Sequence, residues 1–147
     1  MTVPMERIYP RPSQRRHAFL LAAALPLFLG ALLSDYAYWS SYEIQWSNFA
    51  SWLMAGGLVF AGIALACAVI DLFRAERRGG RLLVYFVLLL STFTLGFVNA
   101  LVHARDAWAV MPTGLMLSAV VMVLAGAATW MAFSRQAFAG GSVEDRP

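Results

Sequence analysis

The sequence predicts an all-α integral membrane protein, a four-helix antiparallel bundle with both termini in the cytoplasm. Three observations support this prediction: a surplus of apolar residues, four long apolar segments and an uneven distribution of arginine. Of the 147 residues, 61% are hydrophobic and 13% are charged, whereas a soluble domain is about half apolar and about a quarter charged. A chain of this length has too little interior to bury that surplus, so we expect it to face lipid.

Four apolar segments are candidates to cross a hydrocarbon core about 30 Å thick, although the first, residues 18–34, is short for it. Because the connections between them are short, we assign them to one transmembrane domain, residues 17–134, folded as a bundle. Pro112 is expected in the first turn of the last helix, where a missing N–H is no loss. The predicted spans are residues 18–34, 49–73, 82–102 and 111–133.

The two tails are predicted to lack regular structure. Residues 1–16 include Pro4, Pro10 and Pro12, and prolines at that density disfavour a regular helix. Residues 135–147 are polar and include a Gly-Gly pair, so we predict a disordered tail there.

All eleven basic residues are arginine. Ten of them lie in the tails and in the loop at residues 74–81, and Arg105 is the one arginine in the other two loops. The positive-inside rule therefore predicts that both tails and the 74–81 loop are cytoplasmic. Residues 35–48 and 103–110 are then extracytoplasmic loops. Because the arginines flank the spans instead of following one face, we expect no nucleic-acid partner.

The first extracytoplasmic loop is rich in aromatic residues, which are typical of the headgroup level of a membrane. We interpret it as an aromatic belt along the membrane surface, and the alternative is the floor of a ligand site. Its aromatic residues are Tyr36, Tyr38, Trp39, Tyr42 and Trp46.

Small residues recur at helical spacing in the later spans. Such stripes let helix backbones approach closely in lipid, where no hydrophobic force joins helices. The residues predicted to pack helices are Gly57, Ala61, Ala64, Ala68, Gly96, Gly114 and Ser118. In the third span the stripe includes polar groups, which are costly in lipid unless they face a protein interior. The residues expected to face the other helices there are Tyr85, Leu89, Thr92, Gly96, Asn99 and His103.

Polar residues concentrate at the extracytoplasmic boundary. The candidate cluster is Asp35, Glu43, Asn48, Asn99, His103, Arg105, Asp106 and Trp108. A histidine beside carboxylates can make a structural hydrogen bond, carry a proton or bind a metal. Metal sites usually have three or four ligands, and His103 is the one histidine at this boundary, so we predict no metal site.

Two ion pairs are expected. Arg105 is predicted to pair with Asp35, Glu43 or a lipid phosphate, and the alternative is an anionic ligand from outside. Asp71 stands three residues before Arg74, a spacing that brings two side chains together on a helix.

A b-type haem is the alternative to a protein without a cofactor. The second histidine, His17, is expected at the opposite membrane face, roughly a bilayer away. A haem would therefore need His103 with Met111, or two His103 side chains across a dimer. Cys67 is the one cysteine, so the chain cannot form an intramolecular disulfide. We interpret Cys67 as a buried apolar residue.

The sequence favours a protein that is not an enzyme. It contains no P-loop, GxGxxG or HExxH motif. Ser47, Ser91 and Ser118 lack the sequence neighbours of an activated nucleophile.

Three stretches resemble a family of bacterial membrane proteins, the domain of unknown function 2231. They are ALPLFLGALLSDYAYW, SWLMAGGLVFAGIALACAVIDL and VNALVHARDAWAVMPTGLMLSAVVMVL, within about residues 24–125. In the third stretch, the residues in the family's pattern and order are His103, Arg105, Asp106, Trp108, Pro112, Thr113 and Gly114. Members usually open the first span with a His-Pro and a Phe-Pro pair. This chain keeps only Pro26, and Ala18 follows His17. The resemblance implies a four-span protein of the bacterial inner membrane without an assigned activity.

The leading functional prediction is a non-enzymatic membrane protein. Its outward polar and aromatic face would engage a partner membrane protein, lipid or a second copy of itself. One alternative is an electron-transfer module with haem or metal at His103. The other is a solute or proton pathway through Asn99, His103 and Asp35, but Asp71 is then expected to stand alone at the far end, and a relay needs several ionisable groups.

Overall fold

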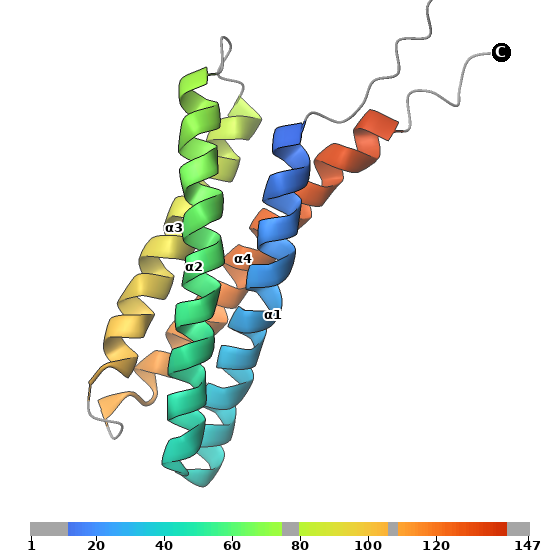
Figure 1. Ribbon diagram of the computed structural model, residues 1–147. Coiled ribbons are helices and arrows are strands. Elements are labelled where there is room, and N and C mark those ends of the chain that lie inside the picture. Colours follow the sequence, from blue (N-terminus) through green and yellow to red (C-terminus); the bar gives the residue numbers. More distant parts are fainter. Residues whose placement is uncertain (1–11, 75–79, 106–108, 141–147) are drawn as a thin grey trace, which may run out of the picture.

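The computed structural model describes residues 12–74, 80–105 and 109–140, and these residues form four helices and no strand. The helices are α1 (Pro12–Ser41), α2 (Ile44–Arg74), α3 (Gly80–His103) and α4 (Thr113–Gly140). They stand side by side in one elongated bundle (Figure 1). The predicted all-α, four-helix architecture is confirmed.

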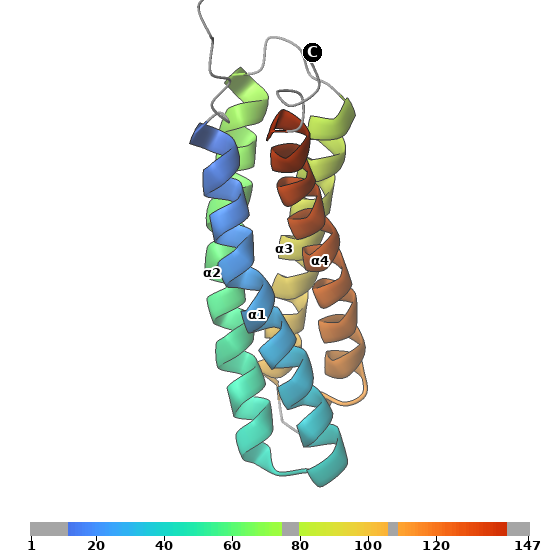
Figure 2. The ribbon, with the colours of Figure 1, turned by 90° about the vertical axis from the view of Figure 1, so that its right-hand side faces the viewer.

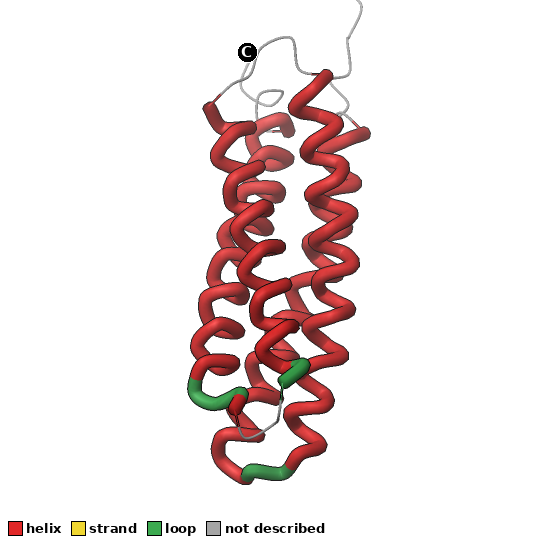
Figure 3. Tube along the Cα trace, turned by 90° about the vertical axis from the view of Figure 1, so that its left-hand side faces the viewer, coloured by secondary structure: helices red, strands yellow, loops and turns green. Residues whose placement is uncertain are grey.

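Each helix packs against its neighbours in the chain, and α4 closes the ring against α1. Successive helices run in opposite directions (Figures 1 and 2), so α1 and α3 are parallel and face each other across the bundle. The start of α1 and the end of α4 lie together at one end, which we call the termini end (Figure 1). The other end carries the α1–α2 connection, and we call it the hairpin end (Figure 3).

The outer surface of the bundle is suited to lipid. Large apolar side chains stand out from it, among them Phe19, Phe73, Val123 and Trp130, each more than 70% exposed. All four helices contain a segment long and apolar enough to cross a membrane. These segments are Arg16–Ser41, Ile44–Arg74, Gly80–His103 and Thr113–Ser134.

The interior is built largely from small residues. The predicted packing residues Gly57, Ala61, Ala64, Ala68, Gly96, Gly114 and Ser118 are all buried. At Gly57, an added Cβ would come within 2.6 Å of the Phe28 ring, so only glycine lets α1 and α2 approach this closely. The six-residue stripe predicted to face inward from the third span is the set that the structure buries on α3.

The predicted loop at residues 35–48 is wrong. Helix α1 continues to Ser41 and α2 begins at Ile44, so Tyr42 and Glu43 form the connection. Tyr42 adopts a positive φ of 55° and donates its N–H to the carbonyl of Tyr38, as residues just after a helix often do. Hydropathy marks where a span leaves lipid, and the polar turns beyond that point are still helical. The aromatic residues therefore lie on helices, and Tyr38 is buried instead of lying at the surface.

The segments without helix at the two ends of the chain are also shorter than predicted. Pro12 opens α1, at a position where a missing N–H is no loss, so residues 12–16 are helical. Helix α4 continues to Gly140, so residues 135–140 are helical as well. Residues 1–11 and 141–147, where the remaining tail predictions fall, lie outside the described residues.

The connection between α3 and α4 also differs slightly from prediction. Thr113 begins α4, so Pro112 precedes the last helix instead of lying in its first turn, and the Met111–Pro112 peptide bond is cis. Asp106 and Trp108, two members of the predicted polar cluster, lie outside the described residues.

Candidate functional site

Four polar side chains from three helices meet inside the bundle, in its hairpin half. Asp35 comes from α1, Asn99 and His103 from α3, and Ser118 from α4. Asp35, Asn99 and Ser118 are fully buried, and His103 is 8% exposed. We call these four residues the buried polar cluster. Ionisable groups are rare inside transmembrane bundles, and where they occur they indicate a functional site.

The hydrogen bonds of the cluster form a directed chain. The Asn99 amide donates to Oγ of Ser118 at 2.8 Å, and the Ser118 hydroxyl donates to Oδ2 of Asp35. The other carboxylate oxygen, Oδ1, lies 2.7 Å from Nε2 of His103. Both oxygens of Asp35 are therefore engaged, one by α3 across the bundle and the other by the neighbouring helix α4.

The proton content of the Asp35–His103 pair follows from the second ring nitrogen. Nδ1 of His103 lies 2.9 Å from the carbonyl oxygen of Asn99. A carbonyl only accepts, so Nδ1 must carry a hydrogen. Nε2 then either carries a second hydrogen facing a carboxylate, or accepts one from a carboxylic acid. In both arrangements one proton lies between Oδ1 and Nε2, and the pair is neutral as a whole.

The packing around His103 depends on Gly114. A Cβ added at Gly114 would lie 2.6 Å from Val110 and 3.1 Å from Cε1 of the His103 ring. The first turn of α4 therefore leaves room for the imidazole only because residue 114 has no side chain.

A groove of about 530 Å³ opens above the cluster at the hairpin end. It is bounded by the first turns of α2 and by the residues at the end of α3. Its lining residues are Ile44, Gln45, Ser47, Asn48, Ser51, His103 and Arg105. The His103 side chain is 1% exposed and Arg105 is exposed, so the imidazole forms the floor and the guanidinium stands at the rim. We call this the His103 groove.

The structure separates the residues predicted to form one outward cluster. Asp35, Asn99 and His103 lie in the buried polar cluster, and Asn48 and Arg105 line the His103 groove. Glu43 is exposed at the α1–α2 connection and lines neither. Of the three partners predicted for Arg105, Asp35 is wrong, because helix α1 continues past Asp35 and turns its carboxylate inward, onto His103 and Ser118.

Ser118 is the cluster residue that sequence reasoning missed, since it was assigned to helix packing alone. It is the one hydroxyl residue among the seven predicted packing residues, which are otherwise glycine and alanine, and that contrast could have identified it. The cluster contains the three residue types of a Ser-His-Asp catalytic triad, but their order in space differs. Asp35 lies between Ser118 and His103, so the imidazole does not reach the hydroxyl that a triad would activate.

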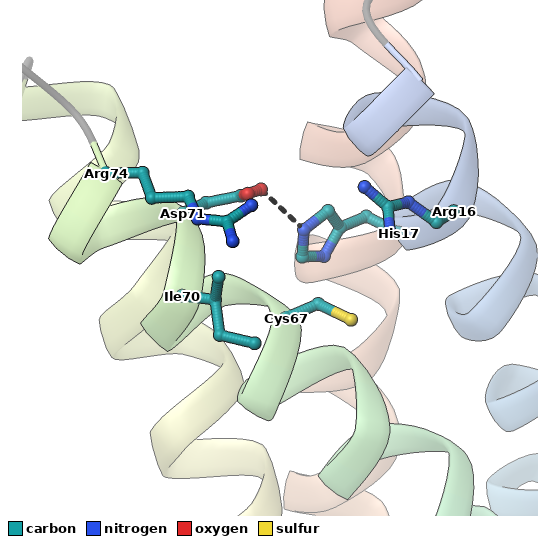
Figure 4. Close-up of a pocket in the computed structure, with 6 residues that line it drawn as sticks. All are labelled: Arg16, His17, Cys67, Ile70, Asp71 and Arg74. Carbon is teal, nitrogen blue, oxygen red and sulfur yellow. Dashed lines mark hydrogen bonds and ion pairs between the residues drawn. The ribbon is translucent and has the colours of Figure 1, made fainter.

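A second histidine cluster lies at the termini end. Nε2 of His17 is 3.1 Å from Oδ2 of Asp71, and Nδ1 of His17 is 3.2 Å from the hydroxyl of Tyr85. The His17 and Tyr85 rings meet edge to face, with centroids 5.5 Å apart. The predicted pairing of Asp71 with Arg74 is wrong, because the first turns of α1 bring His17 to Asp71 (Figure 4).

A comparison with protein families identifies the family of the chain. A family described as predicted membrane protein (DUF2231) matches residues 16–135. The chain belongs to this family. The DUF2231 match includes both histidine clusters and most of the four helices, and it confirms the resemblance found in the sequence. No curated protein and no solved structure matches the chain.

Proposed function

We propose that this DUF2231 protein is a non-enzymatic binding protein of the bacterial inner membrane, with both termini in the cytoplasm and the His103 groove facing outward. The distribution of arginine supports this orientation, because ten of the eleven lie in segments assigned to the termini side. The groove then receives its partner from outside the cytoplasm.

The observation that supports binding is the lining of the groove. Amide, hydroxyl and guanidinium groups from Gln45, Asn48, Ser51 and Arg105 surround an imidazole floor. The volume of about 530 Å³ lies within the roughly 300–1,000 Å³ typical of ligand pockets. Arginine favours carboxylate and phosphate groups, so the partner presents an oxygen anion to Arg105. A partner membrane protein, a lipid headgroup or a second copy of the chain could carry such a group.

Site-specific photocrosslinking in native membranes tests this proposal. A photoreactive amino acid replaces Asn48 in the groove, and a control probe replaces Val59, which is 60% exposed in mid-span. We expect a discrete adduct from position 48 that weakens when Arg105→Gln is added, and lipid adducts alone from position 59. The mass of the adduct identifies lipid, partner or self. Equal products from both positions, unaffected by Arg105→Gln, would refute the proposal.

A proton pathway is the second candidate, and the two histidine clusters favour it. Asp35 follows His17 by 18 residues on α1, and His103 follows Tyr85 by 18 residues on α3, which corresponds to about 27 Å along a helix. Asp71 is thus one member of a hydrogen-bonded group instead of a lone acid. Between the clusters, however, Phe28, Met54, Leu89 and Val121 fill the core, so proton movement would require rearrangement.

Proteoliposomes with an internal pH dye test the pathway. Flux through the wild type should exceed that of empty vesicles and should fall in both His103→Ala and His17→Ala. Flux equal to that of empty vesicles would dismiss this candidate.

Haem or metal binding at His103 stays a hypothesis. The ring nitrogens of His103 both have protein partners, so iron would have to displace Asp35 from Nε2. An absorption spectrum of reduced protein with a Soret band would support haem, and metal analysis of the same sample would test the metal alternative.

A further inference from the structure

A second pocket, of about 240 Å³, lies between α1 and α2 at the termini end (Figure 4). It is lined by Arg16, His17, Cys67, Ile70, Asp71 and Arg74. The four α2 residues follow the spacing i, i+3, i+4, i+7, which places them on one face of the helix. Arg16 and His17 reach this face from the first turns of α1. We call it the arginine pocket.

Hydrogen bonds from three helices hold the wall of this pocket in place. His17 of α1 contacts Asp71 of α2 through Nε2 and Tyr85 of α3 through Nδ1. If the Tyr85 hydroxyl donates to Nδ1, a neutral ring can donate from Nε2 to the carboxylate, so the contacts are satisfied without an added charge. Asp71 is thereby turned toward the imidazole.

The charge of the arginine pocket is positive. Arg16 and Arg74 each add one positive charge, and Asp71 adds one negative charge. Both arginines are exposed. Within the parts of the chain that the structure describes, neither guanidinium forms an ion pair, since Asp71 pairs with His17 and Asp35 with His103. Two guanidinium groups facing one small pocket favour an oxyanion that can accept several hydrogen bonds.

The position of the pocket along the helices limits which kinds of ligand can reach it. The first predicted span begins at residue 18 and the second ends at residue 73, so Arg16 and Arg74 flank the ends of two spans, where the polar surface of the bilayer is expected. Basic pockets between helices at this depth suit phospholipid headgroups. A volume of about 240 Å³ is below the roughly 300–1,000 Å³ of pockets for drug-sized molecules, and fits a single phosphate group with its nearest atoms.

We propose that the arginine pocket binds one phosphate group, held by Arg16 and Arg74 against the wall formed by His17 and Asp71. The phosphate belongs either to an anionic phospholipid of the adjoining leaflet or to a free phosphate ion. This site is separate from the His103 groove, at the other end of the bundle.

Native mass spectrometry of the full chain in a neutral detergent tests the proposal. The probes are phosphatidylglycerol, phosphatidylcholine as a lipid without net charge, and inorganic phosphate. The variants are Arg16→Gln and Arg74→Gln, and the matched control is Arg81→Gln, which removes the same charge at the same end but outside the pocket. Because both pocket arginines are exposed, the variants are expected to fold.

We expect the wild type to bind phosphatidylglycerol more tightly than phosphatidylcholine. Each pocket variant should weaken phosphatidylglycerol binding about fivefold, and Arg81→Gln should change it much less. Binding of inorganic phosphate with the same dependence on Arg16 and Arg74, in place of the lipid, would support the site and identify a free ion as the ligand. Equal losses in all three variants, or phosphate and lipid binding unaffected by Arg16→Gln and Arg74→Gln, would overturn the proposal.

Discussion

Nδ1 of His103 donates to the carbonyl oxygen of Asn99, one turn earlier on α3, at 2.9 Å. This contact distinguishes His103 from His17, whose Nδ1 faces a hydroxyl that can donate as well as accept. His17 can satisfy its partners as a neutral ring with a hydrogen on Nε2 alone, whereas the His103–Asp35 pair needs one proton more, because Nδ1 of His103 must also carry a hydrogen. Each histidine thus contacts an aspartate from another helix, but the two pairs differ in the number of protons that they hold.

Breaking the Asp35–His103 pair should destabilise the protein more than removing it altogether. In His103→Leu the carboxylate of Asp35 stays buried without its partner, which costs roughly 3–5 kcal/mol of unfolding free energy. The double variant Asp35→Leu/His103→Leu leaves no unpaired charge, so it should be more stable than His103→Leu. Denaturant unfolding of the detergent-solubilised protein, followed by circular dichroism, measures both. A double variant less stable than the single would show that the buried Asp35 does not depend on His103 as its partner.

Gly114→Ala should destabilise the bundle, because the new Cβ would meet Val110 at 2.6 Å and the His103 ring at 3.1 Å. Overpacking of this kind costs about 1–3 kcal/mol. Gly126→Ala on the same helix is the matched control, since a Cβ there meets nothing within 4 Å. The control should be neutral or stabilising by up to about 1 kcal/mol, because alanine is the better helix former. Thermal unfolding of the wild type and both variants measures the difference. Equal changes in the unfolding temperature of the two variants would refute the close packing at Gly114.

Ser118→Ala should cost more than Ser34→Ala, although both serines are buried. Ser118 connects Asn99 to Asp35, and its loss leaves a buried amide donor and a carboxylate oxygen without that partner. An unsatisfied buried group costs about 1–3 kcal/mol. The Ser34 hydroxyl donates only to the carbonyl of Gly30 on its own helix, an acceptor that the backbone can share. Unfolding free energies that fail to separate the two variants would show that the Ser118 bonds add little.

The proposed orientation predicts which connection a membrane-impermeant thiol reagent reaches. In a Cys67→Ala background, Glu43→Cys at the α1–α2 connection should be labelled in intact spheroplasts. Arg74→Cys, at the other end of α2, should be labelled only after the membrane is opened. The reverse pattern would place the termini outside and overturn the orientation.

The helices and their inward faces could be predicted from the sequence. On α3, the stripe from Tyr85 to His103 predicted the buried face, because a polar or small residue tolerates a transmembrane position mainly where it meets protein. The helix ends could not be predicted in the same way. The predicted spans end at residue 34 and begin again at residue 49, where polar residues become frequent, yet residues 36–41 and 44–48 are helical. Hydropathy indicates where a span leaves lipid, and the backbone hydrogen bonds of a helix can continue past that point.

The partners of the polar groups were predicted poorly. Asp35 was one of three partners predicted for Arg105, and Asp71 was predicted to pair with Arg74, both on the basis of sequence position. In the bundle, each carboxylate meets a histidine from another helix, 54 or 68 residues away in the chain.

The sequence by itself determined the architecture, the inward faces and the family, because these depend on periodic patterns along single helices and on residue types in order. Only the tertiary structure decided that Asp35, His103, Ser118 and Asn99 form one hydrogen-bonded chain, and that Arg16, Arg74, His17 and Asp71 surround one pocket. Those relationships depend on the rotation and offset of one helix against another. Side-chain packing over the whole interface sets both quantities, and no local pattern records them.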